Sequence, residues 1–258
     1  MVGAKIPERH RTGHKLIQSS NTLTSGGALL ALVIGTICAA AGWSWAVLLV
    51  AFFVSANVLS LYRTKLRAER IDGIVEKGNT RDVWQVAANG GVFALAALGS
   101  LIHPSWVWSA AGAGAIAAVT SDTWSTEIGT VATHPPRLIT SGRVVPAGTS
   151  GGVTIAGSVA AMAGSVFIAV IVFASGWGPR AAAGALAGGV AGSIIDSVIG
   201  ATLQRTRWCN HCEKVTERLV HSCGTMTEPR AGIAWIGNDM VNAISAITGA
   251  LAGIAAAG

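Results

Sequence analysis

Charged side chains are scarce in this chain. Asp, Glu, Lys and Arg make up only 12% of its 258 residues, whereas an ordinary soluble domain carries about 25%. This deficit leaves too few polar groups to cover a water-exposed surface. Alternating apolar and polar runs of about 10 residues, typical of outer-membrane β-barrels, are also missing. Residues 1–21 are polar and basic and lack the short apolar core of a cleavable signal peptide.

Apolar segments of about 20 residues recur along the chain, and hydrophobic residues make up 51% of it. About 20 apolar residues in a helix cross the hydrocarbon core of a bilayer. We therefore predict an all-α fold, a polytopic integral membrane bundle of about seven transmembrane helices. The predicted spans are 23–41, 45–61, 83–102, 105–120, 152–175, 180–203 and 239–257.

Basic residues gather on one side of these spans. Of the 18 Lys and Arg residues, 17 fall on the side of the N terminus and only Arg180 falls on the other. The segments on the N-terminal side are 1–21, 62–82, 121–151 and 204–230. Such an excess marks the cytoplasmic side, so we predict a cytoplasmic N terminus and a C terminus on the opposite side. The net charge of +6 thus indicates orientation in the membrane rather than nucleic-acid binding.

The predicted organisation is a basic cytoplasmic arm, 1–21, followed by a single membrane catalytic domain, 22–258. The connections on the opposite side are only a few residues long, so chemistry is expected to face the cytoplasm from the inner (cell) membrane.

Four carboxylates lie where predicted spans meet the cytoplasmic side: Asp122, Glu127, Asp196 and Asp239. At 1.5 Å per helical residue, Asp122 lies roughly 27 Å from Pro104 and Asp196 roughly 24 Å from Arg180, in a core about 30 Å thick. Charged groups in membrane helices are costly and indicate function. We predict that all four are catalytic, and that Asp122, Asp196 and Asp239 bind Mg²⁺, which prefers oxygen ligands.

The spacing of Asp122 and Glu127 leaves two arrangements open. Five residues correspond to roughly 140° around a helix, so a continuous helix would direct the two side chains to different groups. A helix that ended near Ser125 would let both reach one ion. A polar cap is the structural alternative, although the helix dipole disfavours an acidic residue at a C terminus.

Phosphate-binding candidates surround the fifth span. Thr149, Ser150, Gly151 and Gly152 precede a helix whose N terminus faces the cytoplasm, where free N–H groups bind anions. Arg137 and Arg143 lie just upstream, and guanidinium groups match phosphate oxygens, although anchoring at the membrane surface is the alternative.

Three asparagines fall in the same layer of the membrane. We predict that Asn89 and Asn242 orient phosphates, and that Asn238 binds substrate and is the N-cap of the last helix.

One polar connection carries three of the four cysteines. Cys209 and Cys212 have the spacing of zinc ligands, Cys223 is a third, and His221 or His211 could be the fourth. Three thiols cannot pair off as disulfides. The 204–230 connection is therefore either a zinc-ribbon-like loop, held by Cys209, Cys212, His221 and Cys223, or a loop of reduced thiols.

Six short runs carry a family resemblance. They are ANGG (88–91), SDTWSTEIG (121–129), PRLIT (136–140), GTSGG (148–152), GSIIDSVIGATLQ (192–204) and NDMVN (238–242). In this order they resemble the transmembrane-protein-19-like family, which includes the plant and cyanobacterial phytyl-phosphate kinase of tocopherol synthesis.

The resemblance implies a Mg²⁺-dependent kinase that transfers a phosphoryl group from CTP to phytyl or another isoprenoid monophosphate, giving the diphosphate. Its partners would be the nucleotide, the isoprenoid monophosphate and membrane lipid, without nucleic acid; oligomeric state, including a homodimer, stays open. Phosphoryl transfer needs metal-bridged phosphates and cationic groups, which fits the residues above.

Two other functions remain open. A transporter of a small anionic or isoprenoid substrate would need polar groups near the bilayer midplane, and the outer halves of the spans are almost bare of them. A CDP-alcohol transferase or cytidylyltransferase would use similar carboxylates, but the usual aspartate-rich signature of CDP-alcohol transferases is not visible.

Overall fold

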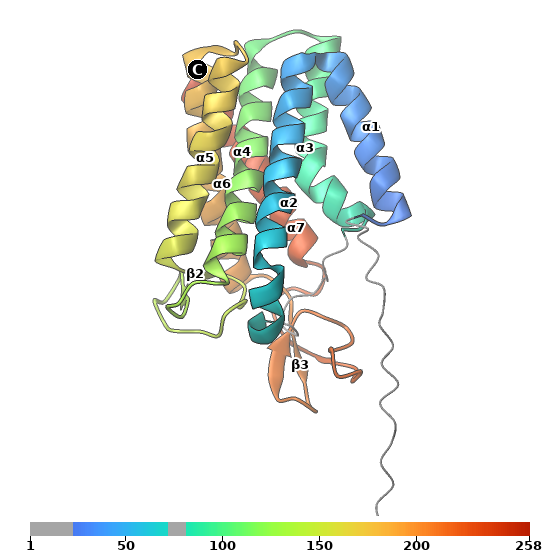
Figure 1. Cartoon of the computed structure of the whole chain (residues 1–258), viewed down its shortest axis with the longest axis vertical. Helices are drawn as coiled ribbons and strands as arrows, with labels where there is room; N and C mark the ends of the chain where they lie inside the picture. The colour runs from blue at the N-terminus through green and yellow to red at the C-terminus, as the bar shows by residue number, and fades with distance from the viewer. Residues whose placement is uncertain (1–22, 72–80) are drawn as a thin grey trace, which may run out of the picture.

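A computed structural model describes residues 23–71 and 81–258, with side chains left out for 64–71. The predicted basic arm, and residues 72–80 of the connection after the second span, lie outside this part of the chain. The described residues contain seven α-helices (Figure 1). These are α1 (Ser25–Ala41), α2 (Trp43–Ile71), α3 (Val83–Ile102), α4 (Trp106–Gly129), α5 (Ile155–Ala174), α6 (Gly178–Thr202) and α7 (Asn238–Ala257).

All seven predicted spans correspond to helices, but two helices are longer than predicted. α2 continues to Ile71, and α4 continues through the polar stretch after Thr120 to Gly129. Polar side chains in α4 are compatible with helix because their hydroxyls bond back along it, as Thr120 does to the carbonyl of Ile116 at 2.7 Å. The predicted 121–151 connection therefore begins only at residue 130.

The starts of four helices are set by side-chain caps. Thr24, Asp82, Ser105 and Thr154 each accept a hydrogen bond from a backbone N–H in the first turn. The last helix differs from our prediction, because its N-cap is Gly237 and Asn238 is already the first helical residue. The side chain of Asn238 therefore does not cap this helix.

Five helical segments in the described chain are long and apolar enough to cross a membrane: 43–63 of α2, and α3, α5, α6 and α7. α1, with 17 residues, is shorter, and α4 is interrupted by its polar end. Connections at one end of the bundle are short, and the long ones lie together at the other end (Figure 1). The carboxyl end of α7 lies at the end with short connections (Figure 1).

The long connections fold into two small antiparallel sheets that the all-α prediction did not include. β1 (Arg137–Leu138) pairs with β2 (Gly152–Val153), with Arg137 opposite Val153. A three-stranded sheet has the order β4-β3-β5, from β4 (Lys214–Thr216), β3 (Thr206–Cys209) and β5 (Glu228–Ala231).

α4 is the central helix of the bundle. Every residue from Ala110 to Ser121 is buried, and α4 packs against α2, α3, α5, α6 and α7. It approaches α6 and α7 most closely, at positions where the facing residues are glycines. A Cβ atom at Gly114 would lie 2.1 Å from the carbonyl oxygen of Gly249, and one at Gly188 would lie 2.5 Å from the Cα of Gly114. Small residues let membrane helices approach at backbone distance.

Replacing Gly114 by Ala should force α4 and α7 apart, because the new methyl group would meet backbone atoms that cannot move independently. We expect a destabilisation of about 1–3 kcal/mol, measured as a lower thermal midpoint in detergent. Gly35→Ala in α1 is the matched control, since a Cβ there meets nothing within 4 Å. Equal midpoints for the two variants would contradict this packing.

Candidate functional site

A cavity of about 130 Å³ opens at the end of the bundle where the long connections gather. Its walls come from the last turns of α4 and α6, the first residue of α7 and the connections between helices. The lining residues are Asp122, Ser125, Thr126, Gly129, Thr130, Pro136, Gly148, Thr149, Ser150, Gly151, Gly152, Thr154, Gly157, Asp196, Ser197, Gln204, Glu217 and Asn238.

Asp122 and Asp196 bring carboxyl groups from α4 and α6 within hydrogen-bonding range of each other in this cavity. The close packing of the two helices places them there: a Cβ at Gly192, one turn before Asp196, would lie 2.3 Å from the Cβ of Ala118, one turn before Asp122. Oδ2 of Asp196 is buried without a hydrogen-bond partner among the described residues. Two adjacent carboxylates in a low-dielectric setting repel unless a proton or cation lies between them.

The Thr149–Gly152 segment forms another wall of the cavity, directly before α5. Its path needs glycine: Gly151 has φ +73°, and a Cβ there would lie 2.4 Å from the backbone nitrogen of Ala201. The segment is therefore seated against the end of α6, close to Asp196. Its own turn is closed by a hydrogen bond from the N–H of Gly152 to the carbonyl of Thr149 at 3.0 Å.

Glu217 is a residue of this cavity that the sequence did not reveal. It follows β4 and is buried, with 8% of its surface exposed. The hydroxyl of Ser150 and the side-chain amide of Gln204, the latter at 2.9 Å, both donate to its Oε1 atom. A single Glu in a polar connection resembles a solvated surface residue, and no spacing relates it to the carboxylates of the helices.

Glu127 does not line the cavity with Asp122. Because α4 is continuous here, Glu127 points to another side of the helix, where it forms an ion pair with Arg63 of α2. Both side chains are nearly buried, at 11% and 2% exposure. Arg63 also donates to the carbonyl of Thr126 at 3.1 Å and to the hydroxyl of Thr130 at 3.0 Å. The observed contacts of Glu127 are those of a structural ion pair between α2 and α4.

Other predicted site residues lie around the cavity rather than in it. Asn242 donates to the side-chain oxygen of Asn89 at 3.1 Å, linking α7 to α3. Asp239 is in the first turn of α7 but does not line the cavity, whereas its neighbour Asn238 does. Arg137 and Arg143 are exposed on the connection that carries β1, and Arg137 donates to the carbonyl of Gly142 at 2.8 Å.

An apolar groove lies between α1, α2 and α3. Its walls include Ile34, Phe52 and Gly90, and three polar residues, Arg81, Gln85 and Asn89, also line it. The Oε1 atom of Gln85 is buried without a hydrogen-bond partner among the residues described. The groove is linked to the cavity through the Asn89–Asn242 hydrogen bond, since Asn242 lies one turn from Asn238 on α7.

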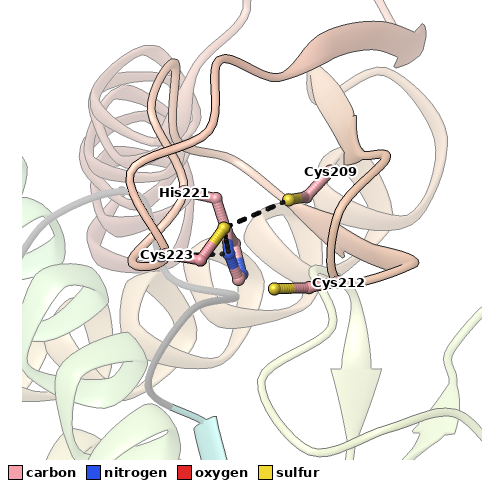
Figure 2. A group of neighbouring side chains, drawn as sticks. All are labelled: Cys209, Cys212, His221 and Cys223. Atoms are coloured by element: carbon pink, nitrogen blue, oxygen red, sulfur yellow. Dashed lines mark hydrogen bonds between the residues drawn. The ribbon is translucent and has the colours of Figure 1, made fainter.

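Three cysteines and one histidine converge in the connection between α6 and α7, as Figure 2 shows. The ligand atoms of Cys209, Cys212, His221 and Cys223 all lie within 4.8 Å of one another. The sequence left His221 and His211 as alternatives, and the structure places His221 in the cluster. Hydrogen bonds with Thr225 and His221 lower the pKa of Cys223 to about 5, which favours its thiolate form. Hydrogen bonding to Cys223 raises the pKa of Cys212 to about 11.

The family model described as integral membrane protein DUF92 matches residues 15–250 of the chain. The chain belongs to this family. DUF92 membership, with the apolar helices, shows an integral membrane protein. The resemblance noted from the six runs thus holds at the level of the family, and no solved structure matches the chain.

Three relatives illustrate the similarity. The chain is 28% identical over 250 residues to Protein PGR of Arabidopsis thaliana, covering 87% of the chain and 85% of the relative. It is 32% identical over 155 residues to uncharacterized membrane protein MJ0933 of Methanocaldococcus jannaschii, covering 59% of the chain and 63% of the relative. Uncharacterized membrane protein sll0875 of Synechocystis sp. is 33% identical over 168 residues, with coverages of 62% and 63%.

Breaking the Arg63–Glu127 ion pair from one side should destabilise the protein strongly. Arg63→Met leaves a buried carboxylate without its cation, so we expect a loss of about 3–5 kcal/mol, read as a lower thermal midpoint. In the double variant Arg63→Met/Glu127→Met, most of that loss should be recovered because neither charge of the pair stays buried. A double variant as unstable as the single one would contradict a purely structural pair.

Proposed function

We propose that this DUF92 protein is a Mg²⁺-dependent kinase that uses CTP to phosphorylate phytyl or another isoprenoid monophosphate at the cytoplasmic face of the membrane. The observation that supports this best is the pairing of Asp122 and Asp196 in a polar cavity at the end of an apolar bundle. The resemblance to the phytyl-phosphate kinase family supplies the substrate class, and the distribution of Lys and Arg supplies the orientation.

The carboxyl pair suits Mg²⁺. Asp122 and Asp196 provide oxygen ligands from two helices, and the buried, unpartnered Oδ2 of Asp196 needs a proton or cation. Asp239, in the first turn of α7 but outside the lining, remains a proposed third ligand. Bound Mg²⁺ would neutralise charge on the nucleotide's phosphates. The protein's own contribution is to hold the two carboxylates together at the end of α4 and α6.

Phosphate groups would be held by the connection that leads into α5. The Thr149–Gly152 segment lines the cavity beside Asp196, and the start of α5 adds the positive end of a helix dipole. Asn238 offers a side-chain amide from α7. Arg137 and Arg143 are exposed outside the cavity, so we propose that they meet the nucleotide from the surface.

The isoprenoid chain would lie in the apolar groove between α1, α2 and α3. Its apolar walls suit a hydrocarbon chain, and Arg81 in its lining provides a positive charge for an anionic head group. Polar contacts continue from this groove towards the cavity through the Asn89–Asn242 bond. A substrate with an apolar tail and a phosphate head would occupy both regions.

The reaction itself needs little covalent help from the protein. A phosphate oxygen of the isoprenoid monophosphate would form a bond to the γ-phosphorus of CTP, while the bond from that phosphorus to the β–γ bridging oxygen breaks and CDP leaves. The second pKa of a phosphate monoester is about 6, so the acceptor is already mostly ionised and requires no strong general base. Positioning and charge neutralisation then provide the catalysis.

Asp122→Asn and Asp196→Asn should each lower kcat by at least about 100-fold, because each removes a charge that would bind the metal nucleotide. The assay is purified protein with phytyl, geranylgeranyl or farnesyl monophosphate and each NTP, following nucleoside diphosphate release. Glu228→Gln, an exposed carboxylate on β5, is the matched control. No turnover with any pair, together with uptake of a solute into liposomes, would overturn the kinase in favour of a transporter.

Gly90→Leu should block the groove, because even a Cβ there would lie 3.1 Å from Cδ1 of Ile34. We expect a KM for the isoprenoid monophosphate at least about 10-fold higher, which corresponds to 1.4 kcal/mol, with the KM for CTP unchanged. Gly91→Leu is the matched control because a Cβ at Gly91 meets nothing within 4 Å. Equal effects of the two substitutions would place the tail elsewhere.

A further inference from the structure

We propose that Cys209, Cys212, His221 and Cys223 bind one structural Zn²⁺, and that this metal site fixes Glu217 in the wall of the cavity. Zinc in tetrahedral sites has bonds of about 2.3 Å to sulfur and about 2.0 Å to nitrogen, so two sulfur ligands are about 3.8 Å apart and a sulfur and a nitrogen ligand are about 3.5 Å apart. The Sγ atoms of Cys209 and Cys223 are 3.6 Å apart, and Nδ1 of His221 is 3.2 Å from Sγ of Cys223 (Figure 2).

A disulfide does not account for this cluster. Bonded sulfur atoms are separated by about 2.05 Å, well below the 3.6 Å between Cys209 and Cys223. A disulfide between any two of the three cysteines would also leave the third as a free thiol next to the bond. The ring of His221 points to the same conclusion, because it is buried and its Nδ1 atom lies 3.2 Å from Sγ of Cys223. Three sulfurs and an imidazole match the ligands that zinc prefers.

The backbone holds the four ligands in two turns. Cys209 ends β3 and Cys212 lies in the turn to β4, which Glu213 closes in a left-handed conformation, at φ 51°. Such a conformation is uncommon outside glycine and occurs at ligand clamps. His221 and Cys223 lie in a second turn, closed by the N–H of Gly224 donating to the carbonyl of His221 at 2.8 Å. The metal would join these turns.

The cluster is linked to the cavity through a short hairpin. β3 and β4 pair antiparallel, with Cys209 opposite Lys214 near the metal cluster and Arg207 opposite Thr216 near the other end. At that other end, Gln204 precedes β3 and Glu217 follows β4, and the two side chains are hydrogen-bonded at 2.9 Å. Glu217 also accepts from Ser150 in the Thr149–Gly152 segment. Zinc that holds the hairpin and the following turn together would therefore position Glu217.

Metal analysis of the purified full-length protein tests the site without any enzyme assay. Elemental analysis should find about one Zn per chain in the wild type, and Cys212→Ser and His221→Ala should lose it. His211→Ala is the matched control, since His211 lies between the two cysteines but outside the cluster, and it should keep the metal. Wild-type protein without zinc after expression in zinc-supplemented medium, or with iron in its place, would overturn the proposal.

A second test asks whether the metal site positions Glu217. It is read through the proposed kinase activity. Glu217→Gln and His221→Ala should raise the KM for CTP by similar factors, and the double variant should be no worse than either alone, because both act through one group. If the rise in KM for the double variant equalled the product of the two single rises, the link between the metal site and Glu217 would be refuted, but the zinc site itself would stand. Zinc content that follows the expected pattern without any kinase activity would support the metal site and reject the kinase.

Discussion

Backbone-distance packing of α4 against α6 and α7 is the constraint on which the candidate site depends. Glycine at positions 114, 188 and 249 removes the side chains that would hold these helices apart. The same approach places Ala118 against Gly192, and one turn further Asp122 lies beside Asp196. In a membrane, where burial of apolar surface does little to draw helices together, such close contact is a main source of helix association. The carboxyl pair is thus a consequence of how the bundle is packed.

The bundle and part of its candidate site could be predicted from sequence. The helices follow from apolar segments of membrane length, and Asp122 and Asp196 stand out because a carboxylate is costly there. The predicted span ended at Thr120, and the sequence left open whether the helix continues beyond it. The structure shows that α4 continues to Gly129. That continuation is why Glu127 meets Arg63, a pairing between helices that no spacing in the sequence encodes.

The connections were less predictable than the helices. Spacing alone grouped Cys209 with Cys212, but the choice of His221 over His211 depends on a turn in three dimensions. Glu217 reaches the cavity only through strand pairing and a bond to Gln204. Membrane helices are constrained by the thickness of the bilayer, whereas polar connections are constrained only by their own contacts. Sequence reasoning is accordingly weakest where the chain leaves the membrane.

The order of the helices along the chain also governs when the bundle becomes complete. α1 and α2 are joined by one residue, and α3 with α4 and α5 with α6 by three residues each, so the first six helices form three hairpins. Among the described helices, α7 is not joined to a neighbour by such a short connection, yet it packs against α3, α4 and α6 and supplies Asn238 to the cavity. Chains fold from their N terminus during synthesis. The cavity is therefore complete only once α7 has been synthesised and has packed into the bundle.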